Sequence, residues 1–243
     1  KAIRRQRQMC IRDRINGVYS AMALLDLDTA KAKKYTDTKS VKEESGYTSP
    51  FCYPLWPCDR VGEYILAKSA VAGAMIQYMA SDNEDVPNQS PSNHLLGVGG
   101  QCLEDGTEVY LDQDQANTVN GYGVTTAINQ NGYRLWGNYT GAYPASSDAK
   151  DIWFAVRRMF SWQGNNFIQT YFDEVDDPMN NVLVQSVVDS ENIRCSAYAP
   201  KYWAGASIEY KSDDNPKTAI LAGTMKFRPV SYTHLTLPTN SLV

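Results

Sequence analysis

One amphipathic segment set among short strand-like runs limits most what this chain can fold into. Apolar residues recur at helical spacing along Ile65–Ala80 and share one face: Ile65, Ala72, Met75, Ile76 and Met79. A helix with such a stripe has to bury it against another element. Because short apolar runs bounded by turn residues lie on both sides of it, we predict an α/β fold that passes into α+β toward the C-terminus.

The segments around this helix give an ordered set of predicted elements. Ile15–Leu27 and Phe51–Trp56 favour strands, although Pro54 removes one hydrogen-bond donor from the second. Lys31–Tyr47 is polar and predicts a surface helix or loop. After the amphipathic helix we expect a loop over Ser81–Asn93, strands over Leu95–Val98 and Glu108–Leu111, a helix over Asp112–Val119, and a hairpin of Val124–Ile128 with Tyr133–Trp136 across Asn129–Gly132.

The last third of the chain is predicted to hold two long helices and a strand pair. Asp148 can cap the first helix, and Gly164 is a candidate kink in it. Its apolar stripe is Ile152, Val156, Met159, Phe160, Phe167 and Tyr171. Asp176-Asp177-Pro178 is typical of a second helix start, with Gly205 as its end. The stripe of this second helix is Val184, Val188, Cys195, Tyr198 and Tyr202. Two paired strands are then expected, Ala206–Tyr210 and Thr224–Arg228, with Pro229 ending the latter.

Both ends of the chain look foreign to its body. QMCIRDR (Gln8–Arg14) and VSYTHLTLPTNSLV (Val230–Val243) resemble translated sequencing-adapter runs, so we expect residues 1–14 and 230–243 to be non-native and to project loosely. Residues 1–14 carry a net charge of +5, which leaves −9 on the rest. An acidic body argues against binding to a phosphate backbone. No apolar run approaches the roughly 18 residues that a membrane span needs.

Histidine is nearly absent, and this excludes most catalytic constellations. Only His94 lies in the body, in a turn that enters a predicted strand, so any Ser–His–Asp triad, Cys–His pair or histidine metal site would need it. Carboxylate pairs are more frequent, and each has a local explanation in a helix cap or a turn: Asp26/Asp28, Asp82/Glu84/Asp85, Asp112/Asp114, Glu174/Asp176/Asp177 and Asp213/Asp214. We therefore predict no catalytic, cofactor-binding or metal-binding residue and no enzymatic activity.

Three further groups of residues invite a functional interpretation and favour a plain one. The spacing of the body cysteines matches no zinc site or redox pair, which predicts reduced thiols: Cys52, Cys58, Cys102 and Cys195. Gly99-Gly100 and Gly121–Gly123 lack the spacing of phosphate-binding loops and predict turns. Arg157-Arg158 indicates a solvated face or a subunit salt bridge rather than a phosphate site.

Several segments, taken in order, resemble contractile-tail sheath proteins of phages, tailocins and related injection systems. They cover essentially the whole body of the chain: Leu25–Asp37 (LDLDTAKAKKYTD), Asn83–Leu96, Leu111–Pro144, Val156–Trp162 (VRRMFSW), Val175–Ile193 and Gly205–Pro216 (GASIEYKSDDNP). The most specific part lies in Leu111–Pro144, where QANTVNGYGVTTA is followed by GYRLWGN.

The resemblance implies a structural subunit that polymerises in stacked hexameric rings around an inner tube protein. Neighbours would be linked by terminal arms that donate strands, and contraction would be a collective switch between two lattices. It implies a virion tail protein assembled in the host bacterial cytoplasm, with no nucleic-acid or membrane partner. Residues 15–130 would belong to a subtilisin-like core domain and 131–229 to a C-terminal sheath domain. A protease is not implied, because the chain lacks a Gly-Thr-Ser nucleophile motif.

Two rival functions and one consequence for assembly follow from the same residues. The sixteen Tyr and five Trp, with the carboxylate pairs, also suit a carbohydrate-active or carbohydrate-binding protein. Such a site needs two or three aromatic rings and a carboxylate pair in one cleft, whereas a sheath spreads its aromatics through cores and interfaces. A baseplate component is a third hypothesis. Without native linking arms, the purified chain is expected to be a monomer or a small, weak oligomer.

Overall fold

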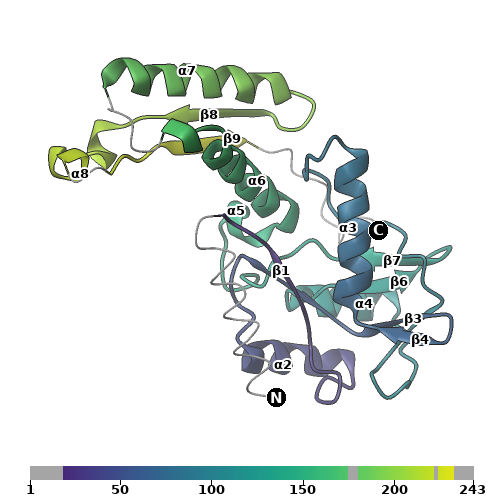
Figure 1. Ribbon diagram of the computed structural model, residues 1–243. Helices are drawn as coiled ribbons and strands as arrows, with labels where there is room; N and C mark the ends of the chain where they lie inside the picture. Colours follow the sequence, from purple (N-terminus) through teal and green to yellow (C-terminus); the bar gives the residue numbers. More distant parts are fainter. Residues whose placement is uncertain (1–18, 175–179, 222–223, 233–243) are drawn as a thin grey trace. The chain divides into compact units, whose positions relative to one another are not determined.

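The computed structural model describes residues 19–174, 180–221 and 224–232 (Figure 1). The chain forms two compact units that divide between Met159 and Phe160, and each unit is described by itself. Both units contain helices and strands, which confirms the mixed α/β class. The predicted domain limits, 15–130 and 131–229, stay predictions. No helix in the described ranges is long and apolar enough to cross a membrane.

The first unit consists of short strand pairs with helices packed around them. Its strands are β1 (Ala23–Asp26), β2 (Cys52–Leu55), β3 (Cys58–Val61), β4 (Tyr64–Leu66), β5 (Gly100–Cys102), β6 (Thr126–Asn129) and β7 (Tyr133–Trp136). Its helical segments are η1 (Tyr35–Asp37), α2 (Thr38–Ser45), α3 (Lys68–Asp82), α4 (Gln113–Gly121), α5 (Ala149–Ile152) and the start of α6 (Phe154–Thr170). β1 and β2 are parallel, β3 lies between β4 and β5, and β6 and β7 form a hairpin.

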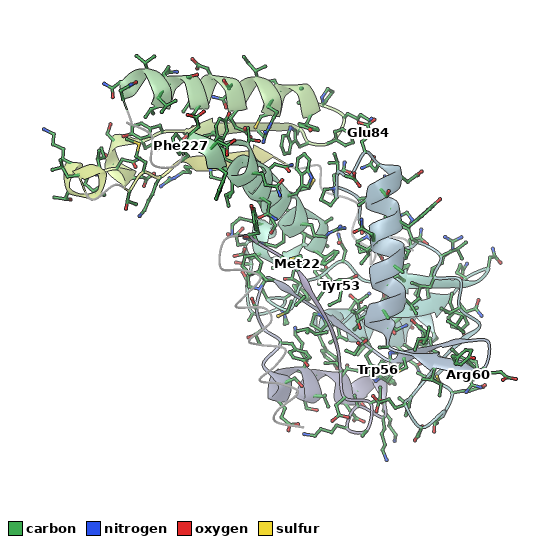
Figure 2. The ribbon with its side chains drawn as sticks, viewed as in Figure 1. Met22, Tyr53, Trp56, Arg60, Glu84 and Phe227 are labelled. Carbon is green, nitrogen blue, oxygen red and sulfur yellow. The ribbon has the colours of Figure 1, made fainter. Side chains whose placement is uncertain are left out.

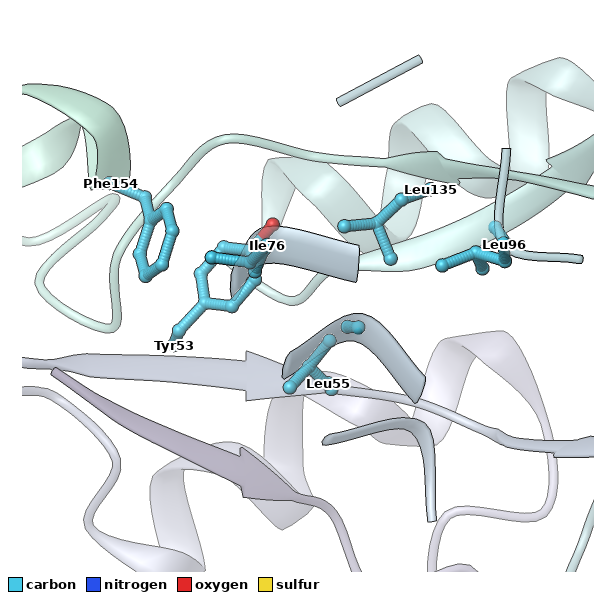
Figure 3. Close-up of a cluster of buried hydrophobic side chains, with 8 residues drawn as sticks. Tyr53, Leu55, Ile76, Leu96, Leu135 and Phe154 are labelled. Carbon is cyan, nitrogen blue, oxygen red and sulfur yellow. The ribbon is translucent and has the colours of Figure 1, made fainter. Parts of the chain in front are cut away.

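Buried side chains from β2, α3, β7 and α6 form the main core of this unit (Figure 3): Tyr53, Leu55, Ile76, Leu135 and Phe154. The rings of Tyr53 and Phe154 stack with their centroids 4.0 Å apart. The Tyr53 hydroxyl donates a hydrogen bond of 2.8 Å to the carbonyl oxygen of Gly137, so this buried polar group is satisfied. A second cluster is centred on Trp56, whose indole nitrogen donates to Ala32.

Strand β2 forms within the predicted segment Phe51–Trp56, and Pro54 does not interrupt it. All four residues of β2 are buried, and Pro54 lies opposite Leu25 of β1. On the other edge, the carbonyls of Cys52 and Pro54 accept hydrogen bonds of 2.8 Å from Gly141 and Thr125 respectively. Two different segments of the chain therefore contact this edge, and no continuous strand lies along it. The absence of an N–H on Pro54 thus breaks no ladder of hydrogen bonds.

The strongest sequence signals are confirmed. The backbone N–H of Gln115 donates to the Asp112 carboxylate at 2.7 Å, and Asp112 N–H donates back to the Gln115 side chain at 3.3 Å, which forms a capping box at the start of α4. The β6–β7 hairpin turns through Asn131 and Gly132, whose φ angles are 54° and 105°. Asparagine and glycine tolerate such angles better than other residues.

Several predicted boundaries of the first unit are wrong. The described strand within Ile15–Leu27 is only β1, and α3 begins at Lys68 because Ile65 lies on strand β4. The sequence pattern does not predict the strands β3, β4 and β5, because each has only three or four residues. In β4, all three side chains are exposed, so no apolar alternation marks this strand. The predicted strands Leu95–Val98 and Glu108–Leu111 reduce to single bridges at Leu95 and Glu108.

The helix predicted to start at Asp148 is interrupted at Trp153, not at Gly164. Asp148 caps α5 by accepting a hydrogen bond of 2.9 Å from the N–H of Lys150. Trp153 then adopts an extended backbone, forms a bridge with Tyr139 and stacks its ring on that tyrosine with centroids 4.7 Å apart. Helix α6 starts at Phe154 and continues through Gly164, because glycine weakens a helix without necessarily bending it.

A buried ion pair joins the start of α3 to strand β3. The Lys68 ammonium donates to the Asp59 carboxylate, and both side chains have no exposed surface. Next to it, the Asp26 carboxylate accepts hydrogen bonds from the N–H and the hydroxyl of Ser69, which ties the end of β1 to the same helix. Burial raises the pKa of Asp59, and Lys68 opposes that rise. Removing only one member of this pair would therefore destabilise the fold, because the other charge would stay buried without a partner.

We predict that Lys68→Met lowers the free energy of unfolding by about 3–5 kcal/mol, because it leaves the Asp59 carboxylate buried without its partner. The matched control is Lys31→Met, which removes an exposed pair with Glu44 and should cost less than about 1 kcal/mol. Urea unfolding followed by tryptophan fluorescence measures both. Equal losses in the two variants would contradict this interpretation.

The second unit packs helices onto a two-stranded antiparallel sheet. Its elements are the rest of α6, η2 (Phe172–Glu174), α7 (Asn181–Tyr198), β8 (Gly205–Glu209), η3 (Ser212–Asp214), α8 (Lys217–Leu221) and β9 (Arg228–Tyr232). Asn180 caps α7 by accepting from the N–H of Leu183 at 2.9 Å. The predicted start at Asp176-Asp177-Pro178 lies outside the described residues. Helix α7 ends at Tyr198, well before the predicted end at Gly205.

The predicted pairing of the last two strands is confirmed, but the second strand is displaced along the chain. β9 begins at Arg228 and includes Pro229 and Val230, so Pro229 does not end it. Pro229 lies opposite Ile208. Residues 230–232 pair with β8, which contradicts the expectation that the whole segment from Val230 projects loosely.

Candidate assembly interface

The β8–β9 sheet offers backbone edges, and its two edges differ. Helix α7 packs along β8, and β9 pairs with the other side of β8 (Figure 1). The buried face of α7 consists of Val184, Val187, Glu191 and Cys195, and Ile208 is the buried residue of β8. No further described strand pairs with either member of this sheet. Unpaired strand edges are sites where another chain can add a strand.

A side-chain amide from α7 occupies the β8 edge at Ile208. The N–H of Ile208 donates to the Asn192 side-chain oxygen at 2.8 Å, and the Asn192 amide nitrogen donates to the carbonyl oxygen of Ile208 at 3.3 Å. Both backbone groups of Ile208 therefore point away from β9. The facing residue is Pro229, which has no N–H to give, so the register places the proline at a pair that needs no bond across the sheet.

The connection between the two strands is held by a second side-chain amide. Asn215 is buried; its amide nitrogen donates to the carbonyls of Lys211 and Lys226 at 2.9 Å, and its oxygen accepts from the N–H of Lys226 at 2.7 Å. Arg228 forms an ion pair of 2.8 Å with Asp214. These contacts fix where β9 starts, and therefore fix its register against β8.

Aromatic rings fill the interior of this unit. The ring centroid of Trp162 lies 5.2 Å from that of Tyr198 and 6.1 Å from that of Trp203, and the Trp203 indole donates to the Cys195 carbonyl at 2.9 Å. Phe227 is labelled in Figure 2. Its ring centroid lies 5.5 Å from that of Phe167 and 6.0 Å from that of Tyr210. Edge-to-face and tilted contacts of this kind are those of a packed core.

The aromatic cluster does not form a sugar site. The cavity beside Trp162 and Trp203 has a volume of about 10 Å³, which is room for about one water molecule. One carboxylate, that of Glu191, lines this cavity, and a glycosidase needs two. The cavity is therefore a small packing void, and it cannot admit a sugar ring.

Glu191 is the buried acid of this core. Its side chain is 2% exposed, one oxygen lies 3.3 Å from the Arg194 guanidinium, and the other oxygen has no hydrogen-bond partner among the described residues. Burial raises the pKa of Glu191 above its ordinary value, and Arg194 partly opposes the rise. Burial likewise raises the pKa of the neighbouring Cys195 thiol, to about 11.

The residues considered for catalysis are dispersed over the described structure. The side chain of His94 is largely exposed and lies directly after a turn. Its pKa is lowered mainly by the part of the ring that is buried and, to a smaller extent, by the positive charge of Arg134. Asp26, Asp112 and Asp214 bind Ser69, the α4 N-terminus and Arg228 respectively. Among the described residues, no group of three His, Cys, Asp or Glu side chains could hold a metal ion. Asp176 and Asp177 lie outside those residues.

The cysteine prediction is confirmed and the arginine pair is clarified. Cys52, Cys58, Cys102 and Cys195 are all buried free thiols, and Cys58 lies opposite Cys102 in the sheet. Arg157 forms an ion pair of 3.1 Å with Asp151 and covers the Phe51 ring at 4.2 Å. Burial lowers the pKa of Arg158 to about 10. Both arginines therefore pack within the first unit and do not form a solvated face.

Sequence reasoning missed the two asparagines that define this interface. Asn192 lies on the α7 sequence between the apolar stripe positions, where a polar residue predicts only an exposed helix face. Asn215 lies in Asp213-Asp214-Asn215-Pro216, which predicts a turn. Nothing in either local pattern identifies a side chain that binds backbone groups distant in sequence.

Comparison with known proteins gives consistent matches. No family model matches the sequence. The major tail sheath protein of Serratia phage KSP20 is 29% identical over 160 residues, which cover 63% of this chain and 38% of that protein. The tail sheath protein of Escherichia phage P2 is 23% identical over 200 residues, covering 77% of this chain and 49% of that protein. Among solved structures, the sheath complex of the PVC extracellular contractile injection system in its contracted state matches with a TM-score of 0.76 and 15% identity, over 97% of this chain and 66% of that one.

We predict that the free energy of unfolding of the second unit decreases as the pH rises from the ordinary glutamate pKa of 4.5 through the raised pKa of Glu191. The folded state holds this proton more tightly than the unfolded state, so the contribution is complete below pH 4.5 and is lost above the folded pKa. Glu191→Gln should flatten this part of the pH profile. Urea unfolding between pH 4 and 8 tests it, and parallel profiles for the two proteins would contradict it.

Proposed function

We propose, from the premise that this chain belongs to the contractile tail sheath family, that it is a structural subunit of a contractile sheath that polymerises around an inner tube and drives contraction. The observation that carries the proposal is the agreement between sequence and fold. Two curated relatives are sheath proteins by name, and sheath structures match over nearly the whole chain. The chain spans less than half the length of each of these relatives.

The finer features of the proposal concern domains, partners and location. Residues 15–130 would be part of a subtilisin-like core and 131–229 a C-terminal sheath domain with two long helices. The partners would be other sheath subunits, stacked as hexameric rings, and an inner tube protein. Assembly would take place in the host bacterial cytoplasm, and the product would be a virion tail.

The two units support this role through rigidity and backbone edges. Each unit has its own packed interior, so each can move as a body while the contacts between subunits change. The β8–β9 sheet ends in backbone groups that a neighbour's extended segment can bind by adding a strand. Such pairing uses main-chain hydrogen bonds, so every subunit of a ring could form the same contact with its neighbour.

A chimeric sheath tests the proposal. The aligned segment of this chain replaces its counterpart in the tail sheath protein of Escherichia phage P2, and the chimera is produced in a phage that lacks its own sheath. We expect tails with a tubular sheath in negative-stain electron microscopy. The original segment, excised and reinserted through the same junctions, is the control. A folded, soluble chimera that never enters a tail, beside a working control, would contradict the proposal.

We predict no hydrolytic activity, because the body has a single exposed histidine, and the acidic residues Asp26, Asp112 and Asp214 have structural partners. A panel of peptide, ester and glycoside substrates should give rates equal to those of buffer. His94→Ala is the diagnostic variant. Turnover by the unsubstituted protein that disappears in this variant would refute the prediction.

A further inference from the structure

We propose that Cys58 and Cys102 form a latent disulfide site, which an oxidant of low molecular weight converts into a covalent link between β3 and β5. The inference rests on the register of one sheet and on the surroundings of its two thiols. It does not use the proposed function, so each can fail without the other.

The register of the β3–β5 pair places the two cysteines opposite each other. Cys58 is the first residue of β3, and its Cα partner is Cys102, the last residue of β5. Opposite residues in antiparallel strands point to the same face of the sheet, with Cα atoms and Cβ atoms each about 4.5–5.5 Å apart. A disulfide needs Cα atoms about 4.4–6.8 Å apart and Cβ atoms about 3.5–4.5 Å apart. The backbone spacing therefore suits a disulfide, which side-chain rotation and a small approach of the Cβ atoms complete.

The other two cysteines of the described residues are not paired in this way. Cys52 lies on β2, opposite Ala23 of β1. Cys195 belongs to the second unit, where its sulfur accepts a hydrogen bond of 3.5 Å from the Gln163 amide. Among the described thiols, the strand registers thus set only Cys58 and Cys102 side by side.

The surroundings of the Cys58–Cys102 pair slow its oxidation while the sheet is closed. Cys58 is 7% exposed and Cys102 is 0% exposed. Burial, and after it the negative charges of Asp26 and Glu104, raise the pKa of the Cys58 thiol to about 12. Because the thiolate is the form that reacts, such a thiol reacts slowly. Transient separation of β3 from β5, which have four and three residues, brings both sulfurs into solvent together.

A small disulfide, such as glutathione disulfide, is the class of oxidant that fits two neighbouring thiols. Cys58, the more exposed of the two, loses its proton and attacks one sulfur of the small disulfide, which releases one small thiol and leaves a mixed disulfide on Cys58. The Cys102 thiolate then attacks the Cys58 sulfur and releases the second small thiol. The two protein thiols thus give up two electrons and two protons, which reduce the small disulfide to two thiols.

The link braces the first unit. It closes a loop from position 58 to position 102 that contains β4 and helix α3, whose residues Ala72 and Ile76 lie in the main core. Closing a loop restricts the unfolded chain and so favours the folded one, as long as the native geometry is kept. A reducing medium leaves the thiols free, whereas an oxidising medium sets the brace. The stability of this unit therefore responds to the redox state of its surroundings.

Oxidation with glutathione disulfide tests the inference. Cys10→Ser removes the cysteine that lies outside the described residues, and this protein is incubated at pH 8 with glutathione disulfide, in urea just below the unfolding transition so that the strands open transiently. Alkylation and mass spectrometry should then find two fewer free thiols and a peptide linked through Cys58 and Cys102. After removal of this urea, the midpoint of urea unfolding should be about 1 M higher than in the same sample reduced with dithiothreitol.

Two alanine variants in the same background serve as a matched pair. Cys102→Ala should abolish both the link and the midpoint shift, whereas Cys52→Ala removes another buried thiol of the first unit and should keep both. Each variant is compared with its own reduced form, so any destabilisation by the substitution cancels. Free thiols at both positions after incubation would overturn the proposal. Glutathione held on Cys58 with no link to Cys102, or a linked chain with a lowered midpoint, would overturn it equally.

Discussion

The need of every buried backbone group for a hydrogen-bond partner controls both units of this protein. In the first unit, β2 is buried along its whole length, so both of its edges have to be satisfied. β1 pairs with one edge, and single residues from distant loops, Thr125 and Gly141, bond to the other. This arrangement gathers Tyr53 and Leu55 into the main core and admits Pro54 into a fully buried strand.

The second unit meets the same requirement with side chains in place of strands. A sheet of two strands leaves two open edges, and asparagine amides satisfy part of them because they carry a donor and an acceptor in one plane. Asn215 bonds to the backbone before β9, and Asn192 bonds to the backbone of β8. The backbone groups on the strand edges that have no partner in the described structure can then bind another chain. In the proposed sheath subunit, an open strand edge is a place where a neighbour can add a strand.

The sequence predicts well those elements whose local chemistry is self-contained. The Asp112–Gln115 capping box and the Asn131-Gly132 turn need only neighbours within a few residues, and both form where expected. Prediction fails where a distant contact decides. Trp153 leaves the helical pattern because it pairs with Tyr139. The candidate interface belongs to this second kind, because Asn192 acts on a strand sixteen positions later. The family resemblance led to the proposed function, whereas no local pattern could have found this contact.

The most direct test of the account is an electron cryomicroscopy map of a sheath polymer that contains this chain. The account predicts that each unit keeps its fold, that a strand from a neighbouring subunit joins the β8–β9 sheet, and that the Asn192 amide remains bound to Ile208. A sheath in which the Asn192 amide is displaced from Ile208 would contradict it, as would a lattice in which subunits touch without any added strand.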